Sequence, residues 1–223
     1  MIEDYIIDKP YQPTSDEVKA IDKIKKNGIT KKDWNSKRKG IESLKRNIRE
    51  YMFYKQGCMC AYCKMEMLLG CSNLQKDHIV PKSSHLQWMF LPQNLCVTCD
   101  KCNNYKGDIE TLVDSNVTVY PSEGKSFKII HPFFDKYSDH IEIVDDLIYR
   151  ARTDKGKFTI NTCKLFRLEL ISDRARLKLK TENSDSLMIK IISLIDNEKD
   201  KKEIIKIVKD IINNYKQVIC RNI

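Results

Sequence analysis

Two short cysteine pairs, Cys-Ala-Tyr-Cys at residues 60–63 and Cys-Asp-Lys-Cys at residues 99–102, decide which fold this chain can adopt. A Cys-x-x-Cys pair forms a tight turn that directs two thiolates at one metal ion, and a second pair completes a tetrahedral zinc site. The pairs are separated by 35 residues. Common zinc ribbons have a shorter gap of ~15 to 20 residues. We therefore expect a zinc-stapled segment whose gap contains further functional residues.

The nine cysteines leave one alternative open for the zinc ligands. Cys96, Cys99 and Cys102 form two overlapping Cys-x-x-Cys pairs, and Cys58 lies just before the first pair. Two complete and separate pairs are the simplest ligand set for a structural zinc ion. We assign the site to Cys60, Cys63, Cys99 and Cys102.

The gap contains Asp77-His78-Ile79-Val80-Pro81-Lys82, and Asn103 follows the last cysteine. Adjacent side chains on a strand point in opposite directions, so one of Asp77 and His78 can hold a metal while the other faces a substrate. A carboxylate suits Mg²⁺ or Mn²⁺, and a neutral imidazole with a pKa near ~6.5 can take a proton from water. These residue types indicate metal-dependent phosphodiester hydrolysis.

Residues 60–107, which also include Asn94 and an Asn-x-x-Lys-Gly ending, resemble the HNH (ββα-metal) endonuclease superfamily. The resemblance implies that Asp77 and Asn103 hold one divalent cation and that His78 is the general base. It also implies that Asn94 hydrogen-bonds to the backbone of the loop that orients the histidine. The last motif position is Asn103 instead of histidine, as in the branch that looks like the phage resolvase endonuclease VII. An amide oxygen is also a hard ligand.

Other polar side chains near the motif are weaker candidates. Lys82 and Lys106 flank the motif, where a cation could meet the scissile or a neighbouring phosphate, and we assign both to substrate binding. We expect His85 at the surface or as a helix cap. For His131 and His140 we favour packing over metal binding.

The formal net charge of +9 is concentrated before the first cysteine pair. Residues 19–55 contain thirteen Lys and Arg against four Asp and Glu, and the other residues balance. Such a run is often only a solvated helix face. Beside a phosphodiesterase motif, we expect it to be a phosphate-binding arm with steep salt dependence.

The expected fold is α+β, with a basic helical arm (residues 1–56), a zinc-stapled ββα-metal core (57–110) and an α/β extension (111–223). Start signals and periodicity predict helices from Ser15 to near Gly28, and from after Thr30 to Gly57. In the extension we predict short strands and then two helices. The strands are at 127–130, 141–149 and 157–162, and the helices at 163–180 and 199–219. Asp154-Lys155-Gly156 is interpreted as a turn.

The chain lacks a signal-peptide pattern at its start and has no long apolar run, so we expect a cytoplasmic protein without membrane contact. Duplex DNA is the preferred substrate by resemblance. The alternatives are a non-catalytic zinc-dependent nucleic-acid-binding module, and a nuclease effector gated by a partner ATPase, as in anti-phage systems such as Septu. The Ile-rich C-terminal region is a candidate partner or homodimer surface.

Overall fold

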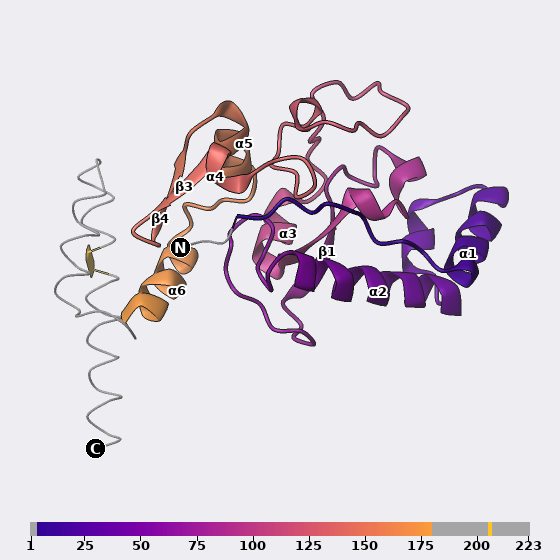
Figure 1. Ribbon diagram of the computed structural model, residues 1–223, viewed down its shortest axis with the longest axis horizontal. Helices are drawn as coiled ribbons and strands as arrows, with labels where there is room; N and C mark the ends of the chain where they lie inside the picture. Colours follow the sequence, from indigo (N-terminus) through magenta and orange to yellow (C-terminus); the bar gives the residue numbers. More distant parts are fainter. Residues whose placement is uncertain (1–3, 180–204, 207–223) are drawn as a thin grey trace, which may run out of the picture. The chain divides into compact units, whose positions relative to one another are not determined.

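The computed structural model describes residues 4–179 and 205–206 (Figure 1). Its α-helices are α1 (Ser15–Lys26), α2 (Lys39–Lys55), α3 (Asp100–Lys106), α4 (Tyr137–His140), α5 (Asp154–Thr162) and α6 (Leu168–Leu179). Its strands are β1 (Leu74–His78), β2 (Leu95–Cys99), β3 (Ile141–Val144) and β4 (Ile148–Ala151). Short 3-10 turns are η1 (Lys31–Asn35), η2 (Leu86–Trp88), η3 (Pro92–Asn94) and η4 (Gly124–Ser126). The predicted α+β class is confirmed.

The chain divides into two compact units, residues 1–141 with 151–164 and residues 142–150 with 165–223. The predicted segment boundaries at residues 57 and 111 both fall within the first unit, as do all the predicted site residues. The helix predicted over 199–219 lies outside the described residues apart from 205–206. Within the described part of the chain, no helix is both long enough and apolar enough to cross a membrane.

Helix α1 begins where the sequence predicts. Thr14 and Glu17 form a reciprocal capping box, in which the Thr14 hydroxyl accepts from the Glu17 N–H (3.4 Å) and the Glu17 carboxylate accepts from the Thr14 N–H (2.9 Å). Helix α2 begins later than expected, because η1 forms a separate turn that ends at Asn35. The buried stripe of α2 consists of Ile41, Leu44, Ile48, Met52 and Phe53.

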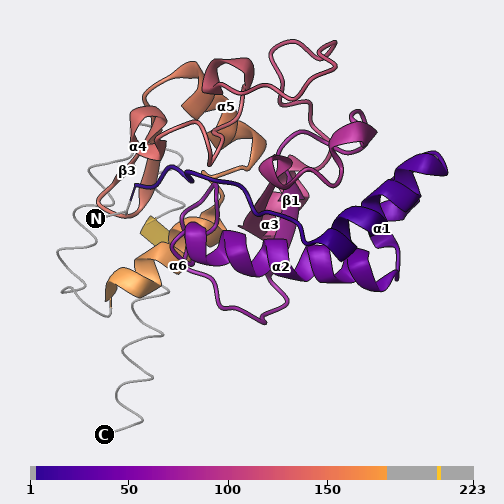
Figure 2. The ribbon, with the colours of Figure 1, turned by 45° about the vertical axis from the view of Figure 1, so that its right-hand side comes forward.

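Strands β1 and β2 form an antiparallel pair, and α3 follows β2 directly. In this register Asp77 faces Cys96 and His78 faces Leu95. The Cys99 side chain caps α3 by accepting from the Cys102 N–H. Figures 1 and 2 both show α2 running alongside this ββα unit, and α2 contacts β2. The unit brings β1 and α3, the two elements that carry the predicted catalytic residues, side by side.

Four predictions for the extension are wrong or incomplete. Residues 157–162 form part of helix α5 and not a strand. Residues 127–130 contain only an isolated bridge, from Phe127 to Leu112. The segment 141–149 is a hairpin, because Asp145 and Asp146 adopt positive φ between β3 and β4. Helix α6 starts at Leu168 and not at residue 163.

Gly156 explains why the turn interpretation of residues 154–156 fails. Thr153 caps α5 by accepting a hydrogen bond from the Gly156 N–H (3.2 Å). A Cβ at position 156 would lie 1.9 Å from the His140 carbonyl oxygen. The glycine is therefore required for close packing against a neighbouring backbone segment, and it does not mark a turn.

This packing predicts that Gly156→Ala destabilises the protein. Alanine favours an exposed helix by about 1 kcal/mol over glycine. Here the backbone must move apart to admit the methyl group, so we expect a net loss of about 1–3 kcal/mol. Thermal unfolding measures the loss, and Lys157→Ala on the exposed side of α5 is the control. Equal midpoints for the two variants would contradict the close approach.

Candidate metal and catalytic site

The two cysteine pairs converge in the structure. The sulfur atoms of Cys60, Cys63, Cys99 and Cys102 all lie within 4.8 Å of one another. The Sγ atoms of Cys63 and Cys99 are 3.8 Å apart. A tetrahedral zinc site with ~2.3 Å Zn–S bonds has S···S separations of about 3.8 Å, so the donor set fits this ion. The four cysteines can therefore bind zinc.

Cys96, the alternative ligand, lies apart from this cluster. It is buried on β2, and its Sγ lies 3.8 Å from the hydroxyl of Tyr62. Because successive residues on β2 alternate in direction, Cys96 cannot share the face of Cys99, three residues later. The ligand set that the structure brings together is the predicted one.

Asp77 is held by two donors. The Tyr62 hydroxyl donates to its Oδ2 (2.7 Å), and the Lys106 ammonium donates to its Oδ1 (3.1 Å) and to the His78 carbonyl oxygen (2.7 Å). Burial raises the pKa of Asp77 above its usual value, and the Lys106 charge and the Tyr62 hydrogen bond oppose that rise. Tyr62 lies between Cys60 and Cys63, so the first cysteine pair directly positions the carboxylate.

The two lysines predicted to bind substrate have different surroundings. The Lys106 side chain is fully buried, and its ammonium lies between Asp77 and the His78 carbonyl. In this position it orients the carboxylate and does not face the solvent. Lys82 lines the cavity beside His78 and has no ion pair among the described residues.

His78 is anchored through one ring nitrogen. Its Nε2 lies 3.0 Å from the Met89 carbonyl oxygen, an acceptor, so Nε2 carries the proton and Nδ1 is left as a base. Burial, followed by the charge of Lys82, lowers the pKa of His78 to about 3. The imidazole is therefore neutral at neutral pH. The Trp34 ring covers it, with ring centroids 4.4 Å apart.

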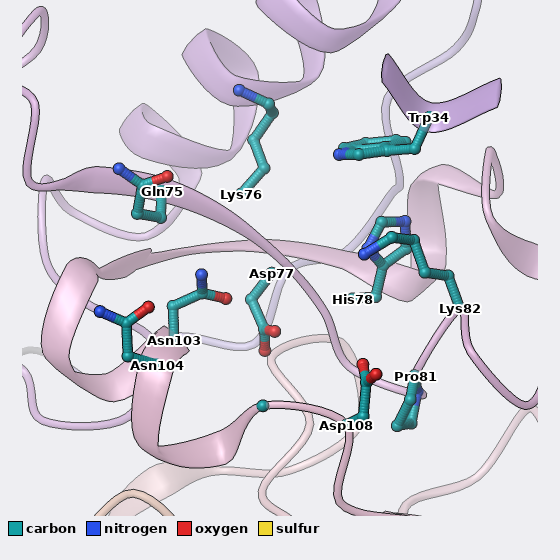
Figure 3. Close-up of a pocket in the computed structure, with 11 residues that line it drawn as sticks. Trp34, Gln75, Lys76, Asp77, His78, Pro81, Lys82, Asn103, Asn104 and Asp108 are labelled. Atoms are coloured by element: carbon teal, nitrogen blue, oxygen red, sulfur yellow. The ribbon is translucent and has the colours of Figure 1, made fainter. Parts of the chain in front are cut away.

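A cavity of about 340 Å³ gives access to these groups (Figure 3). Asp77, His78, Lys82 and Asn103 line it, and so does Asp108, which the sequence analysis did not single out. In Figure 3 the Asn103 amide lies beside Asp77 and the Asp108 carboxylate points into the cavity. Each Asp77 oxygen keeps a lone pair after its hydrogen bond. Carboxylate and amide oxygens are the donor types that hard divalent cations prefer, and Asp77, Asn103 and Asp108 bring them to one cavity lining.

Asn94 fastens the loop between β1 and β2. Its Oδ1 accepts from the Val80 N–H (2.8 Å), and its Nδ2 donates to the carbonyls of Val80 (3.0 Å) and Trp88 (3.3 Å). Both ends of the stretch leading to Met89 are thus tied to one fully buried amide.

Residues beyond the motif complete this anchor. The Tyr120 hydroxyl lies 3.1 Å from the Asn94 Oδ1 and 2.9 Å from the His131 Nε2. His131 is fully buried among aromatic rings, which agrees with the predicted packing role. His85 is also buried, stacked on Trp88, so the surface position is wrong; it is the N-cap residue of η2, without a side-chain capping hydrogen bond. No local sequence pattern identifies Tyr120 or Tyr62 as residues that support the site.

Comparisons with known proteins give one distant relative. The chain is 25% identical over 123 residues to the Septu protein PtuB of Bacillus thuringiensis. The match covers 55% of this chain and 42% of that protein, so it spans less than half of the relative's length. No protein-family model and no solved structure matches the chain.

The cysteine geometry predicts different zinc contents for two serine variants. We expect Cys99→Ser to lose zinc, because one of four tetrahedral ligands is removed, and to unfold the ββα unit. Cys96→Ser should keep one equivalent of zinc, since its thiol lies outside the cluster. Elemental analysis of purified protein measures both. Zinc loss in Cys96→Ser with retention in Cys99→Ser would contradict the assignment.

The buried Lys106 predicts a large stability effect. Lys106→Met leaves the Asp77 carboxylate buried without its counter-ion, and breaking such a pair costs about 3–5 kcal/mol. Urea denaturation of the zinc-loaded protein measures the loss, with Lys25→Met on exposed α1 as the control. If both variants unfold at the wild-type urea concentration, Lys106 does not hold the carboxylate.

Proposed function

We propose that this chain is an HNH-type endonuclease that hydrolyses phosphodiester bonds in DNA, with His78 as general base and one divalent cation. The observation that carries the proposal is the anchoring of His78. With Nε2 bound to the Met89 carbonyl, the unprotonated Nδ1 belongs to a side chain that lines the same cavity as Asp77 and Asn103. A general base within reach of a metal-binding carboxylate is the arrangement that phosphodiester hydrolysis requires.

In the proposed reaction, the His78 Nδ1 accepts a proton from water as the water oxygen attacks phosphorus in line with the leaving 3′ oxygen. The new P–O bond forms, the bond to the 3′ oxygen breaks, and the 3′ oxygen takes a proton from solvent. The products carry 5′-phosphate and 3′-hydroxyl ends. The Met89 carbonyl keeps the ring in the reactive tautomer, and burial keeps the Nδ1 unprotonated at neutral pH before the reaction, because it lowers the pKa of the imidazole.

Asp77 and Asn103 would hold the Mg²⁺ or Mn²⁺, which when bound would neutralise charge that develops on the phosphate and the leaving oxygen. Lys106 and Tyr62 keep the carboxylate fixed for this task. Lys82, on the cavity wall, would contact a substrate phosphate.

The similarity to a Septu protein supports a role in anti-phage defence for this chain. Within that role we propose that nuclease activity is gated by a partner ATPase. A non-catalytic nucleic-acid-binding module is the competing function, because it needs the zinc knuckles and the basic arm. A module that only binds nucleic acid does not require a neutral histidine next to a buried carboxylate.

His78→Ala should abolish cleavage while zinc content and DNA binding stay near wild type, because the histidine is not a zinc ligand. General-base removal typically costs about 10²–10⁴ in rate. The assay is nicking of supercoiled plasmid in Mg²⁺ or Mn²⁺, with and without EDTA. His140→Ala is the matched control, since His140 does not line the cavity.

Two outcomes would contradict the proposal. Robust cutting by His78→Ala would remove the histidine mechanism. Tight DNA binding by the wild type without EDTA-sensitive nicking, in the presence of the candidate partner ATPase as well as without it, would support the binding module.

A further inference from the structure

Three cations gather beside the cavity without carboxylate partners. Lys45 and Arg49 come from α2, and Lys76 comes from β1. Lys76 lines the cavity, and the Lys45 ammonium lies 5.6 Å from the centroid of the Trp34 ring, which also lines it. Among the described residues, none of the three cations forms an ion pair. The Lys45 ammonium donates only to the Trp34 carbonyl oxygen (2.9 Å).

The cations interact unfavourably with one another. Burial lowers the pKa of Lys76, and the charges of Arg49 and Lys45 lower it further. Burial also lowers the pKa of Lys45, although Glu42 partly opposes this effect. Folding thus brings like charges together on a half-buried surface. A solvated helix face would keep such cations exposed and apart, so it does not explain this arrangement.

Arg49 adds an independent observation. Its Nε is buried and has no hydrogen-bond partner in the described part of the chain. A buried donor without a partner costs about 1–3 kcal/mol. A guanidinium presents several donors in a planar fork that matches phosphate oxygens. No described residue therefore compensates the Arg49 guanidinium, and its other N–H groups can donate to an anionic acceptor from outside the chain.

We propose that Lys45, Arg49 and Lys76 form a binding subsite for the phosphodiester backbone of the nucleic acid, next to the scissile bond. The proposal rests on the proposed nuclease function and extends it. Figure 3 shows Lys76 and Lys82 on different sides of the Asp77–His78 pair. A strand that contacts both would therefore place an intervening phosphate in the cavity beside His78. The subsite explains which part of the basic arm meets the substrate.

The test compares two double variants with equal loss of charge, both made in a His78→Ala background so that substrate is bound and not cut. Arg49→Gln/Lys76→Gln removes the subsite, and Lys23→Gln/Lys25→Gln removes two exposed lysines of α1. Fluorescence anisotropy measures affinity at several salt concentrations for labelled duplex DNA, single-stranded DNA and RNA of the same sequence.

We expect the subsite variant to bind at least about tenfold more weakly at low salt, because charge-assisted hydrogen bonds are lost. The slope of log affinity against log salt should fall by about 0.9 for each duplex phosphate contact removed. The α1 variant should keep both the affinity and the slope. The three nucleic acids identify which backbone is preferred.

Unchanged affinity and slope in the subsite variant would overturn the proposal, and so would an equal loss in both variants, which would indicate only net charge. Arg49→Lys/Lys76→Arg keeps the charges and should keep the slope, which separates contact loss from misfolding. A wild type that cuts no nucleic acid, with the candidate partner ATPase as well as without it, would end the nuclease proposal. Selective loss of binding in the subsite variant would still support the subsite.

Discussion

The convergence of four thiols from two distant cysteine pairs is the constraint on which the rest of the site depends. A two-stranded sheet and a helix of two turns bury too little apolar surface to be stable alone. Four sulfurs within 4.8 Å of one another close the 35-residue gap and fix β2 and α3 against the first knuckle. Because Tyr62 lies inside that knuckle and donates to Asp77, the same constraint reaches the carboxylate through one hydrogen bond.

Adjacent residues on β1 acquire separate anchors from this arrangement. Strand alternation sends Asp77 and His78 in opposite directions, as Figure 3 shows. Asp77 meets Lys106 from α3, whereas His78 meets the Met89 carbonyl from the β1–β2 loop. The position of that loop depends in turn on a single amide, Asn94, whose three hydrogen bonds tie Val80 and Trp88 together. Neither functional side chain therefore relies on the other for its orientation.

The sequence predicted the parts of the site that chemistry and spacing define. Cysteine spacing identified the four-cysteine cluster, and the start of α1 at Ser15 followed from its helix-start residues. Prediction from the sequence failed where contacts between residues that are far apart in the chain determine the local structure. Gly156 has a turn-like sequence context, but it lies in α5, where the absence of a Cβ lets the His140 carbonyl approach. A lysine is usually expected at the surface. Lys106 is buried because it lies on the same side of α3 as Cys102, four residues earlier. Asp108 and Trp34 join the cavity only once β1, η1 and α3 are assembled.

The cations around the cavity differ in whether a carboxylate neutralises them. Where a cation has a structural task, as Lys106 does, the fold supplies a buried carboxylate. Lys45, Arg49, Lys76 and Lys82 have no such partner among the described residues, although residues outside 19–55 include as many acidic as basic side chains. Mutual repulsion among Lys45, Arg49 and Lys76 lowers stability unless a ligand relieves it, and a bound polyanion would do so. The presence or absence of a carboxylate partner thus distinguishes the cation that stabilises the site from the cations that are available to a substrate.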